Sequence, residues 1–529
     1  MLIGYVSDER YVALADVALE FLDDRGGSWA THSRASGSVH LALPPGDYRV
    51  ILQKPGYGAK FAHVTIPLAA PHHFRLLSDG LLGYAWPKWV RSGEASEFRV
   101  HSVEPYKLEL WRYGWEPERV RNLGWHDEHG PRATMQITPD GDYTRTGVCW
   151  NEVGYANSVH SQHVVSPARS GLYYFRASTA SGRRFAFPWI VAPERASAPV
   201  AVLASTMTWN AYNNFGGRSN YIHADGLPPT PTINARAELK RYNNAGFFTW
   251  NAADYPPLSF DRPEPFNHID FNETISDPIE GRQACHLAPA EWRLLGWLEH
   301  QGFPFDLYAE NQLDAGVLDL TQYRVLVIST HPEYWTRRMY ERVKRWVNDE
   351  GGRLAYFGGN GLNCEVELLG DAMICHNGAI RGLDVAGLGG HESRTAMRHE
   401  SEANLLGVVF TPAGAMTGAP YRVLDADHWA FTGTGLKNGE LFGLKSLQQR
   451  CPGGASGHET DKVSPSSPAN VVKLAKGLNP NDGGADMIVY ETPSGGAVFA
   501  AGSINWPASL PVDADVSQIT ENVLNVFLE

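Results

Sequence analysis

A strand–helix–strand unit over residues 325–361 constrains the fold of this chain more than any other feature. Val325–Ile328 is a run of four apolar residues rich in β-branched side chains, which predicts a buried strand because it is too short for a helix. A helix is predicted over 336–350, where apolar residues recur at helical spacing and Gly351 ends the element. Arg353–Phe357 predicts a second strand. Units of this kind favour a sheet with parallel strands.

Polar residues follow both predicted strands at their carboxyl ends. His331 and Glu333 come after the first strand, and Asn360 comes after the second. In open α/β sheets, ligands and chemistry lie at that edge. The alternative interpretation is local: His331 caps the helix, and Glu333 is a first-turn charge that the helix dipole favours.

The rest of the chain indicates several domains, since domains average about 150 residues. Turn-separated strand patterns fill 1–75 and 76–195, whereas strands and helices alternate over 196–529. We therefore expect a multidomain protein in which two N-terminal all-β sandwich modules precede an α/β domain. That domain should have a mostly parallel sheet in glutamine-amidotransferase-like or flavodoxin-like layers. A segment rich in Gly, Ser and Pro, Pro452–Ser467, predicts a mobile loop.

The first module resembles the small transthyretin-like β-sandwich known as a carboxypeptidase regulatory-like domain. The resemblance rests on Leu43–Val50, a proline–glycine turn leading into a strand, and on Lys54–Gly58 behind it. Residues 1–75 contain no cluster of acids, bases or metal ligands. Deleting them is therefore expected to leave the chemistry of the site intact.

Composition excludes several classes of function. The chain has 45 basic and 58 acidic residues, and its formal charge of −13 argues against binding to nucleic acid or anionic membranes. No apolar window approaches the roughly eighteen residues of a membrane helix, and no signal-peptide pattern opens the sequence, so a cytoplasmic protein is expected. The five cysteines are scattered without a Cys-x-x-Cys pair, which predicts free thiols.

The residues around Asn360 narrow the chemistry. Related α/β folds mount a nucleophile at this strand-to-helix position. Asparagine cannot act as a covalent nucleophile, but its amide can donate a hydrogen bond to a developing oxyanion. The chain has no Gly-x-Ser-x-Gly motif, and Cys364 lies a full helical turn beyond the strand-to-helix position of Asn360. Water is therefore the better candidate nucleophile, and it usually requires a metal.

A loop over 208–226, dense in Asn, Gly and aromatic residues, offers metal ligands. If Tyr212 and Tyr221 joined Glu333 on one ion, two phenolates and one carboxylate would form a hard site of formal charge −3. Such a site suits Fe(III) and suits zinc poorly. A trivalent cation would also ionise a tyrosine, whose ordinary pKa is near 10. The alternative is that these tyrosines only pack.

Several motifs together carry a resemblance to a known family. In chain order they are Thr208-Trp-Asn-Ala-Tyr212-Asn-Asn-Phe-Gly-Gly-Arg-Ser-Asn-Tyr221, Ser259-Phe-Asp-Arg262-Pro263, His331-Pro-Glu333-Tyr-Trp335, Phe357-Gly-Gly-Asn360-Gly361 and Gly502-Ser503. With these motifs, residues 196–529 resemble the large, catalytic subunit of N,N-dimethylformamidase and its relatives. The histidine–glutamate and asparagine motifs at this spacing are the specific part.

The resemblance implies a mononuclear Fe(III) held by two tyrosines and one glutamate. The matching positions are Tyr212, Tyr221 and Glu333. Tyr255 stays open as the second phenolate, because the segment before Arg262 differs in length from the family pattern.

Three further residues match the pocket of the family. His331 and Asn360 match residues that line it, and a further family glutamate corresponds to Glu459 through the loosely similar segment 457–461. The resemblance therefore implies an iron-dependent amidohydrolase that cleaves the C–N bond of a small amide, such as an N-substituted formamide, by metal-activated water. The family enzyme also has a separate small subunit, and such a partner stays open here. A homo-oligomer is expected.

Two other functions remain open at this stage. One is a carbohydrate-associated binding protein with an inactive α/β domain, whose β modules would present tryptophans at positions 86, 89, 111, 115, 125 and 150. The other keeps catalysis but takes a larger amide or a urea derivative.

Overall fold

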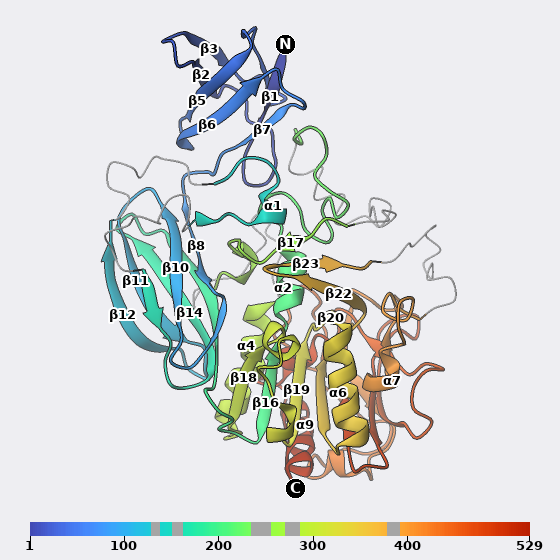
Figure 1. Ribbon diagram of the computed structural model, residues 1–529. Coiled ribbons are helices and arrows are strands. Elements are labelled where there is room, and N and C mark those ends of the chain that lie inside the picture. Colours follow the sequence, from blue (N-terminus) through green and yellow to red (C-terminus); the bar gives the residue numbers. More distant parts are fainter. Residues whose placement is uncertain (128–137, 151–161, 234–254, 270–285, 378–391) are drawn as a thin grey trace.

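The computed structural model describes residues 1–127, 138–150, 162–233, 255–269, 286–377 and 392–529. Three groups of sheets follow one another along the chain (Figure 1). The N-terminal group stands at one end of the molecule, and the C-terminus lies at the opposite end. Among the described cysteines, those at 149, 364, 375 and 451 are free thiols; Cys285 lies outside the described residues.

The N-terminal module consists of two sheets around one apolar core. The first has the order β4 (Ser38–His40), β1 (Leu2–Ser7), β7 (His72–Arg75). The second has the order β3 (Ser28–His32), β2 (Ala18–Leu22), β5 (Gly46–Lys54), β6 (Gly58–Ile66). Alternating residues of β5 and β6 are buried, as expected for strands with one face on a core. The arrangement is consistent with the expected β-sandwich.

The second module is also built from two sheets and has its own core. One sheet has the order β13 (His163–Val165), β10 (Ala95–Ser102), β8 (Leu81–Trp86). The other has the order β12 (Glu118–His126), β11 (Tyr106–Arg112), β14 (Gly171–Thr179), β15 (Arg184–Ala192), β9 (Trp89–Arg91). Of the six tryptophans considered above, Trp150 is fully buried, and only Trp115 and Trp125 are exposed. They do not form one aromatic face.

The largest sheet follows in the C-terminal part. Its order is β18 (Phe305–Ala309), β16 (Val200–Ala204), β19 (Val325–Thr330), β21 (Arg353–Gly358), β32 (Ala497–Ala500), β31 (Asp486–Glu491), β30 (Val472–Gly477), β26 (Tyr421–Val423), β27 (Leu441–Phe442). Neighbours from β18 to β32 pair in parallel, whereas neighbours from β32 to β27 pair antiparallel. The sheet is mixed, so the expected α/β domain with a mostly parallel sheet is not supported, and neither is its amidotransferase-like or flavodoxin-like layering.

The reason lies in the connections after β21. Parallel neighbours require a long crossover, whereas antiparallel neighbours need only a tight turn. The chain joins β31 to β32 through such a turn, in which the Thr492 N–H donates to the carbonyl of Gly496 at 2.7 Å. The alternation of helices and strands that predicted a parallel sheet holds as far as β21 and does not extend beyond it.

Helices cover both faces of the parallel strands. They are α2 (Thr206–Tyr212), α4 (Ala288–His300), α5 (Glu310–Asp314), α6 (Arg337–Asp349), α7 (Ala403–Leu406), α8 (Trp506–Ser509) and α9 (Ala514–Leu528), with α1 (Tyr143–Thr146) outside this sheet. Helix α6 confirms the helix predicted over 336–350. Its first turn is capped by Thr336, whose hydroxyl accepts from the Met339 N–H at 3.1 Å. On the opposite face, α8 and α9 pack against β19 and β21 (Figure 1).

The prediction of a mobile loop over Pro452–Ser467 is wrong. The segment contains β28 (Ser456–Gly457) and β29 (Asp461–Lys462), and most of its residues from 454 to 462 are buried. Gly457 donates its N–H to the Ser503 hydroxyl at 2.8 Å, and Asp461 donates its own to the carbonyl of Gly502 at 2.9 Å. Glycine and serine serve here for close packing of backbones.

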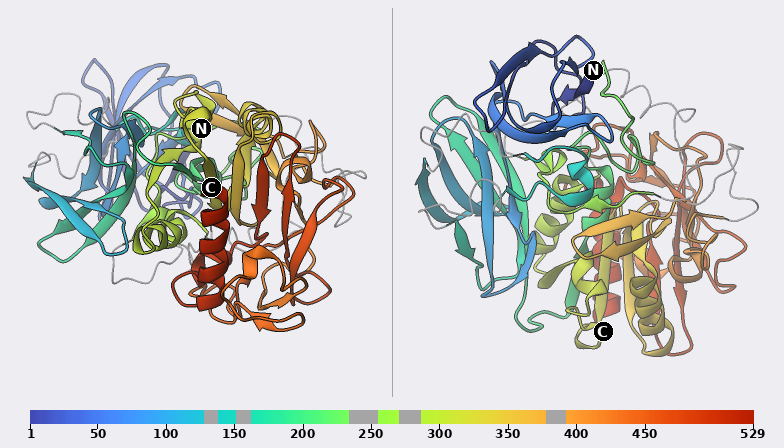
Figure 2. Two further views of the ribbon diagram at one scale, coloured as in Figure 1. Left: turned by 90° about the horizontal axis from the view of Figure 1, so that it is seen from below. Right: turned by 45° about the horizontal axis from the view of Figure 1, so that its top comes forward.

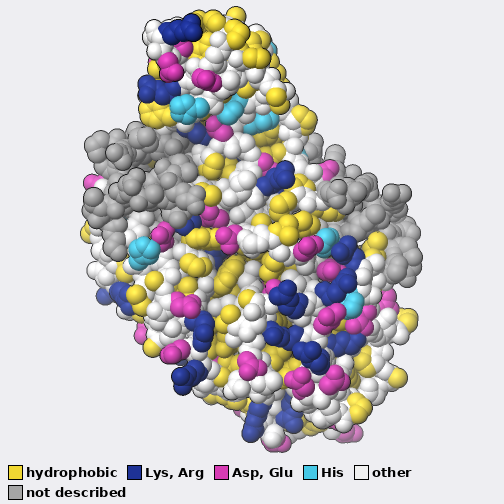
Figure 3. Space-filling view, viewed as in Figure 1, with side chains coloured by type: hydrophobic (Ala, Val, Ile, Leu, Met, Phe, Trp, Pro, Cys, Tyr) yellow, Lys and Arg dark blue, Asp and Glu magenta, His cyan; other side chains and the backbone are white. Residues whose placement is uncertain are grey.

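Within the part of the chain that the structure describes, no helix is both long and apolar enough to cross a membrane. Basic and acidic side chains are interspersed over the face seen in Figure 3, so the negative net charge is not gathered there into one patch.

Candidate functional site

The candidate site lies beyond the carboxyl ends of the parallel strands β16, β19 and β21 (Figure 1). Within this sheet, the strand that follows β16 along the chain is β18, which pairs with one side of β16, and the next, β19, pairs with its other side. A reversal of strand order of this kind opens a crevice at the carboxyl edge of a sheet. Helix α2 leaves β16 at this edge and ends at Tyr212, while the turn after β19 carries His331 and Glu333.

Three of the sequence-predicted residues meet at this edge. The Tyr212 and Tyr221 hydroxyl oxygens lie 2.7 Å apart. The Glu333 carboxylate accepts from Tyr212 at 3.1 Å and from Tyr221 at 2.9 and 3.0 Å. Tyr212 and Glu333 are buried, and Tyr221 is partly buried. The structure thus brings together the two phenols and the carboxylate from segments more than 100 residues apart in the sequence.

The charge of this cluster comes from Glu333. Burial by itself would raise the pKa of this carboxyl group, but the Arg394 guanidinium and the His331 imidazole outweigh burial and lower the pKa to about 2. Arg394 donates to Glu333 Oε1, to Asn363 at 3.0 Å and to Asn377 at 3.1 Å. Glu333 is therefore an anion, held in place by a buried cation.

Tyr221 is in a different electrostatic state. Burial and the neighbouring Glu333 carboxylate raise its pKa well above the usual value, so without a cation the phenol keeps its proton. The Tyr334 hydroxyl donates to Tyr221 at 2.8 Å, and the Asn220 amide donates to Tyr334 at 2.9 Å. The Tyr221 hydroxyl is thus held by Tyr212 and Glu333 as acceptors and by Tyr334 as a donor.

The donor set fits a hard cation in size and in chemistry. Neighbouring ligands of an octahedral cation with bonds of about 2.0–2.1 Å lie about 2.8–3.0 Å apart, close to the 2.7–3.1 Å between the oxygens of Tyr212, Tyr221 and Glu333. All of these donors are oxygens, which hard cations prefer. Among the described residues, no group of three or more His, Cys, Asp or Glu side chains is placed to hold a metal ion. A metal here would depend on the phenols.

The second group of predicted residues lies against the first. His331 Nε2 is 3.2 Å from Glu333 Oε2 and 3.1 Å from Glu459 Oε2. The Asn360 amide nitrogen donates to Glu459 Oε2 at 2.8 Å and lies 3.3 Å from His331 Nε2. Burial would lower the pKa of His331, but hydrogen bonds to the two carboxylates raise it to about 9.

This protonation state assigns the contacts of Asn360. With the pKa of His331 raised, the imidazole carries a proton on Nε2, directed at Glu333 and Glu459, so Nε2 cannot accept from Asn360. One N–H of the Asn360 amide reaches Glu459. The amide nitrogen also lies 3.3 Å from His331 Nε2, which does not accept from it while that nitrogen carries a proton.

Backbone strain surrounds the same residues. Thr330, Asn360 and His458 have φ values of 61°, 52° and 64°, in the left-handed region that side chains rarely adopt. Each directly precedes or is one of the predicted pocket residues. Such conformations persist where the surrounding structure determines them, and they concentrate at functional sites.

Other motif residues support the site from behind. The Arg262 side chain is buried and donates to the carbonyls of Phe215 at 2.7 Å and Ser259 at 2.8 Å. Asp461 accepts from the Asn360 N–H at 2.8 Å and from the Tyr356 hydroxyl at 2.7 Å. These residues shape the loops and do not reach the three oxygens.

Tyr255, the other candidate for the second phenolate, is placed differently. It is buried, and its hydroxyl has no hydrogen-bond partner among the described residues. Burial raises its pKa, and the charge of Arg394 is close enough to lower it in part. The structure therefore places Tyr221, and not Tyr255, in contact with Tyr212 and Glu333.

Sequence reasoning missed several residues around the cluster. Arg394 is the most important, because it neutralises Glu333, yet no motif surrounds it in the sequence. His286, whose Nδ1 lies 3.0 Å from His331 Nδ1, was also missed. Tyr334 could have been found, because it stands inside the motif that supplied His331 and Glu333.

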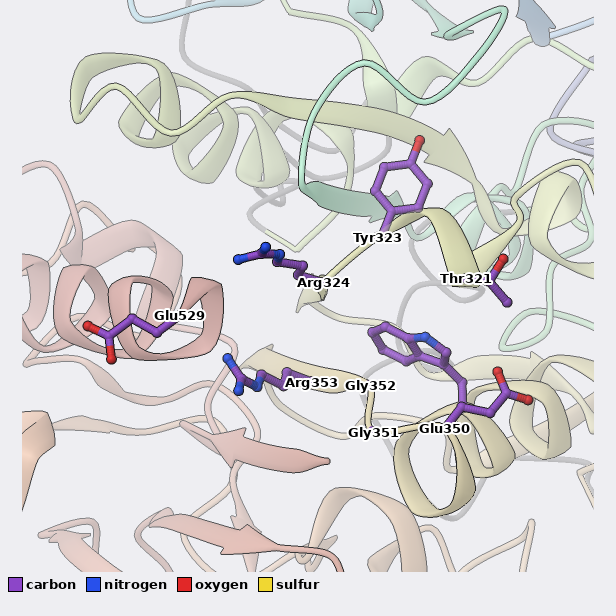
Figure 4. A pocket seen from close by; sticks show the side chains of 9 residues that line it. Thr321, Tyr323, Arg324, Glu350, Gly351, Gly352, Arg353 and Glu529 are labelled. Atoms are coloured by element: carbon purple, nitrogen blue, oxygen red, sulfur yellow. The ribbon is translucent and has the colours of Figure 1, made fainter. Parts of the chain in front are cut away.

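A cavity of about 350 Å³ lies at the opposite edge of the sheet, near the start of β19 and β21 (Figure 4). Arg324 and Arg353 line it and face the end of α9, where they donate to the carbonyls of Leu528 and Phe527. Cations favour the carboxyl end of a helix dipole, so these arginines stabilise α9 and are remote from the candidate site.

The sequence is similar to one family of known proteins. A family model described as "N,N-dimethylformamidase beta subunit-like, C-terminal" matches residues 107–521. Two relatives, from Alcaligenes sp and Paracoccus aminophilus, are both described as "N,N-dimethylformamidase beta subunit". Each is 26% identical to this chain, over 65% of the chain and 50% of the relative. The chain spans about half the length of these curated relatives.

Two solved structures overlap with this chain only weakly. A β-galactosidase from Bacillus circulans sp. alkalophilus has a TM-score of 0.27 at 13% identity, over 44% of this chain and 26% of that chain. A β-galactosidase from Rahnella sp. R3 has a TM-score of 0.28 at 10% identity, over 63% of this chain and 31% of that chain. Overlap at this level assigns no shared fold. The family match, in contrast, extends over more than half of the sequence, and the chain therefore belongs to the N,N-dimethylformamidase beta subunit-like, C-terminal family.

Proposed function

We propose that this chain is the catalytic subunit of an iron-dependent amidohydrolase, which cleaves the C–N bond of a small amide such as an N-substituted formamide. The observation that carries the proposal is the meeting of Tyr212, Tyr221 and Glu333, with their oxygens 2.7–3.1 Å apart, in a member of the dimethylformamidase family. Both matched relatives are described as subunits of N,N-dimethylformamidase, which supports an amide as the substrate class.

The proposed cofactor is a mononuclear Fe(III), held by Tyr212, Tyr221 and Glu333. Such an ion, when bound, would supply Lewis acidity toward a carbonyl oxygen or a water molecule. Arg394 pairs with Glu333 Oε1, and His331 Nε2 lies 3.2 Å from Oε2, so both neighbours hold the carboxylate in position. The charge of Arg394 also keeps Glu333 ionised and ready for a cation.

The remaining polar residues are suited to handle the substrate oxygen and the protons. Asn360 has an N–H that is not needed by Glu459, and we assign it to the oxygen of the scissile amide as negative charge develops there. Glu459 is close to both Asn360 and His331, and its carboxylate can accept a proton from attacking water. His331, which carries a proton, can return one to the leaving amine.

We also propose that the chain assembles with a separate subunit, because both relatives are described as beta subunits. Homo-oligomerisation and a cytoplasmic location stay predictions. Light scattering of the purified chain, alone and after co-expression with a second subunit, would test assembly.

Iron content tests the proposed function most directly. The purified chain is expected to contain about one iron per chain and to show a visible phenolate-to-iron charge-transfer band. It should also release amine from N,N-dimethylformamide or a related formamide. A chain that binds no iron under anaerobic and aerobic loading, or that hydrolyses no small amide when loaded, would refute the proposal.

Replacing single tyrosines by phenylalanine tests the ligand set. Tyr212→Phe and Tyr221→Phe are each expected to weaken iron binding at least about tenfold and to shift the charge-transfer band, because each removes a phenolate. Tyr255→Phe is the matched control and should leave the band unchanged. An unchanged spectrum for Tyr221→Phe together with a changed one for Tyr255→Phe would move the second phenolate to Tyr255.

Cys364→Ser is expected to keep most of the activity. The thiol is fully buried, and burial raises its pKa to about 12, so almost no thiolate exists near neutral pH. Activity per folded chain should be measured below the melting temperature, because a buried hydroxyl lowers stability. Detection of an acyl group on Cys364 by mass spectrometry would contradict water as the nucleophile.

A further inference from the structure

The N-terminal module contacts the loop that carries Tyr221. This loop, residues 213–232, runs from the end of α2 past Tyr221 and along the module and is called here the Tyr221 loop. Figures 1 and 2 show the module at the end of the molecule toward which the carboxyl edge of the parallel strands points, next to α1. Contacts with the module lie on both sides of Tyr221 along the chain.

The first set of contacts is at Gly216 and Gly217. The Gly216 N–H donates to the carbonyl of Glu9 at 2.7 Å, and its carbonyl accepts from the Arg75 guanidinium at 2.9 Å. Gly217 packs so closely on the module that a Cβ added there would lie 2.4 Å from the Tyr11 Cβ. The loop can follow this path only with glycine at that position, and its φ of 91° points to the same requirement.

The second set of contacts is at Pro228 and Thr232. The Tyr11 hydroxyl donates to the carbonyl of Pro228 at 2.8 Å. The Thr232 N–H donates to the carbonyl of Tyr11 at 3.0 Å, and the Thr232 carbonyl accepts from the Ala13 N–H at 2.7 Å. The last two bonds form a short parallel bridge between the module and the loop.

Arg75 joins these contacts to the rest of the molecule. Its side chain is fully buried, and besides Gly216 it donates to the carbonyls of Asp8 and Gly141, each at 3.0 Å. The guanidinium also lies 4.5 Å from the ring centroid of Tyr143 and 5.1 Å from that of Tyr11. An arginine can make all of these contacts at once because its five N–H groups form a planar fork.

We propose that the N-terminal module is a clamp that holds the Tyr221 loop, with Arg75 and Tyr11 as positioning residues for the Tyr221 phenol. The phenol must stay within about 3 Å of Tyr212 and Glu333, as the structure has it. Misplacement by about 1 Å at a catalytic group lowers activity on the order of a hundredfold. The proposal rests on the proposed function for the role of Tyr221, but the clamp itself does not depend on iron.

The clamp changes what is expected of the module. Its sequence contains no catalytic cluster, so its deletion was expected to leave the site intact. Its contacts with Gly216, Pro228 and Thr232 lead to the opposite expectation: a chain without residues 1–75 would lose bonds on both sides of Tyr221. The module would thus act on the site without supplying a ligand.

Hydrogen exchange in the full-length, metal-free chain tests the clamp. Arg75→Met and Tyr11→Phe are compared with Arg49→Met, a matched control on an exposed position of β5 in the same module. In Arg75→Met, amides of the Tyr221 loop are expected to exchange at least about tenfold faster than in wild type, because a lost anchor raises local opening. The amides of β5 and β6 should be unchanged, and Arg49→Met should match wild type throughout.

Tyr11→Phe keeps the ring against Arg75 and removes the hydroxyl contacts to the Pro228 carbonyl and to His73 Nδ1, which lies in the module itself. It therefore remains informative if Arg75→Met does not fold. It is expected to speed exchange at 228–232 more than at 216–217. The clamp would be overturned if the Tyr221 loop exchanged at wild-type rates in a folded Arg75→Met. If Arg75→Met does not fold, wild-type rates in Tyr11→Phe would overturn it.

Iron loading gives the second measurement. Arg75→Met is expected to shift the phenolate charge-transfer band and to lower iron per folded chain, whereas Arg49→Met should not. Faster exchange with an unchanged band would overturn the role of the clamp in placing Tyr221. A wild-type chain that binds no iron would refute the proposed function alone, because the exchange comparison would still decide whether the module holds the loop.

Discussion

Glu333→Ala is expected to lose all bound iron, with iron per folded chain near zero by elemental analysis. The substitution removes the one carboxylate of the proposed ligand set and leaves two phenols to hold the ion. Glu333→Gln, which keeps the volume but is neutral, should behave alike, because a neutral amide is a poor partner for a hard trivalent cation. Glu365→Gln is a suitable control: Glu365 pairs with Arg337 at 2.9 Å and contacts neither tyrosine.

Glu333→Ala is also expected to be less stable than the wild type. Removing Glu333 leaves the buried Arg394 without its carboxylate, and breaking a buried ion pair from one side lowers the free energy of unfolding by about 3–5 kcal/mol. The folded pKa of Glu333 is lowered from 4.5 to about 2, so its contribution to stability is complete above pH 4.5 and is lost as the pH falls toward 2. The free energies of unfolding of metal-free wild type and Glu333→Ala, measured by denaturant titration, should therefore differ at neutral pH and become equal in acid. Full iron content in a folded Glu333→Ala would show that the ligand set is wrong.

Asn360→Ala is expected to retain iron but lose activity, on the order of ten- to a thousandfold, as found when one oxyanion donor is removed. The loss should appear mainly in kcat, because the amide interacts more strongly as charge develops on the substrate oxygen. The side chain donates to Glu459 and is not among the proposed iron ligands. Iron per chain and the charge-transfer band should therefore match the wild type.

Backbone strain at Asn360 requires a matched variant. Its φ of 52° is costly for alanine but accessible to glycine, and its N–H bond to Asp461 is independent of the side chain. Asn360→Gly should therefore lose as much activity as Asn360→Ala while remaining closer to wild type in stability. Full activity in either variant would remove Asn360 from the mechanism, and loss of iron from Asn360→Gly would assign it a role at the metal.

Local sequence patterns were sufficient for the elements that build the carboxyl edge. The apolar run at 325–328 became β19, the amphipathic stretch after Thr336 became α6, and the run before Gly358 became β21. These predictions depend only on the burial pattern and the caps of a single element. Residues adjacent in the sequence determine both. The motifs around Tyr212, Glu333 and Asn360 follow such elements, so their placement at one edge could also be predicted.

The sequence alone could not determine how the sheet continues after β21. Pairing there depends on turn lengths and on partners such as β30 and β32, and the result is a mixed sheet. The prediction of a mobile loop at 452–467 failed for the same reason, because glycine and serine also occur where backbones pack closely. Composition does not distinguish a mobile loop from a closely packed segment, because only burial by distant strands separates the two.

The sequence by itself determined which residue types could form the site, and tertiary structure decided which of them meet. Tyr221 and Tyr255 are equivalent as side chains, and only the path of the loop puts the Tyr221 hydroxyl 2.7 Å from Tyr212. Arg394 carries no local signal, yet it sets the charge of Glu333 across 61 residues of sequence. Contacts between remote segments depend on how whole modules pack, and this is the physical reason why no local pattern records them.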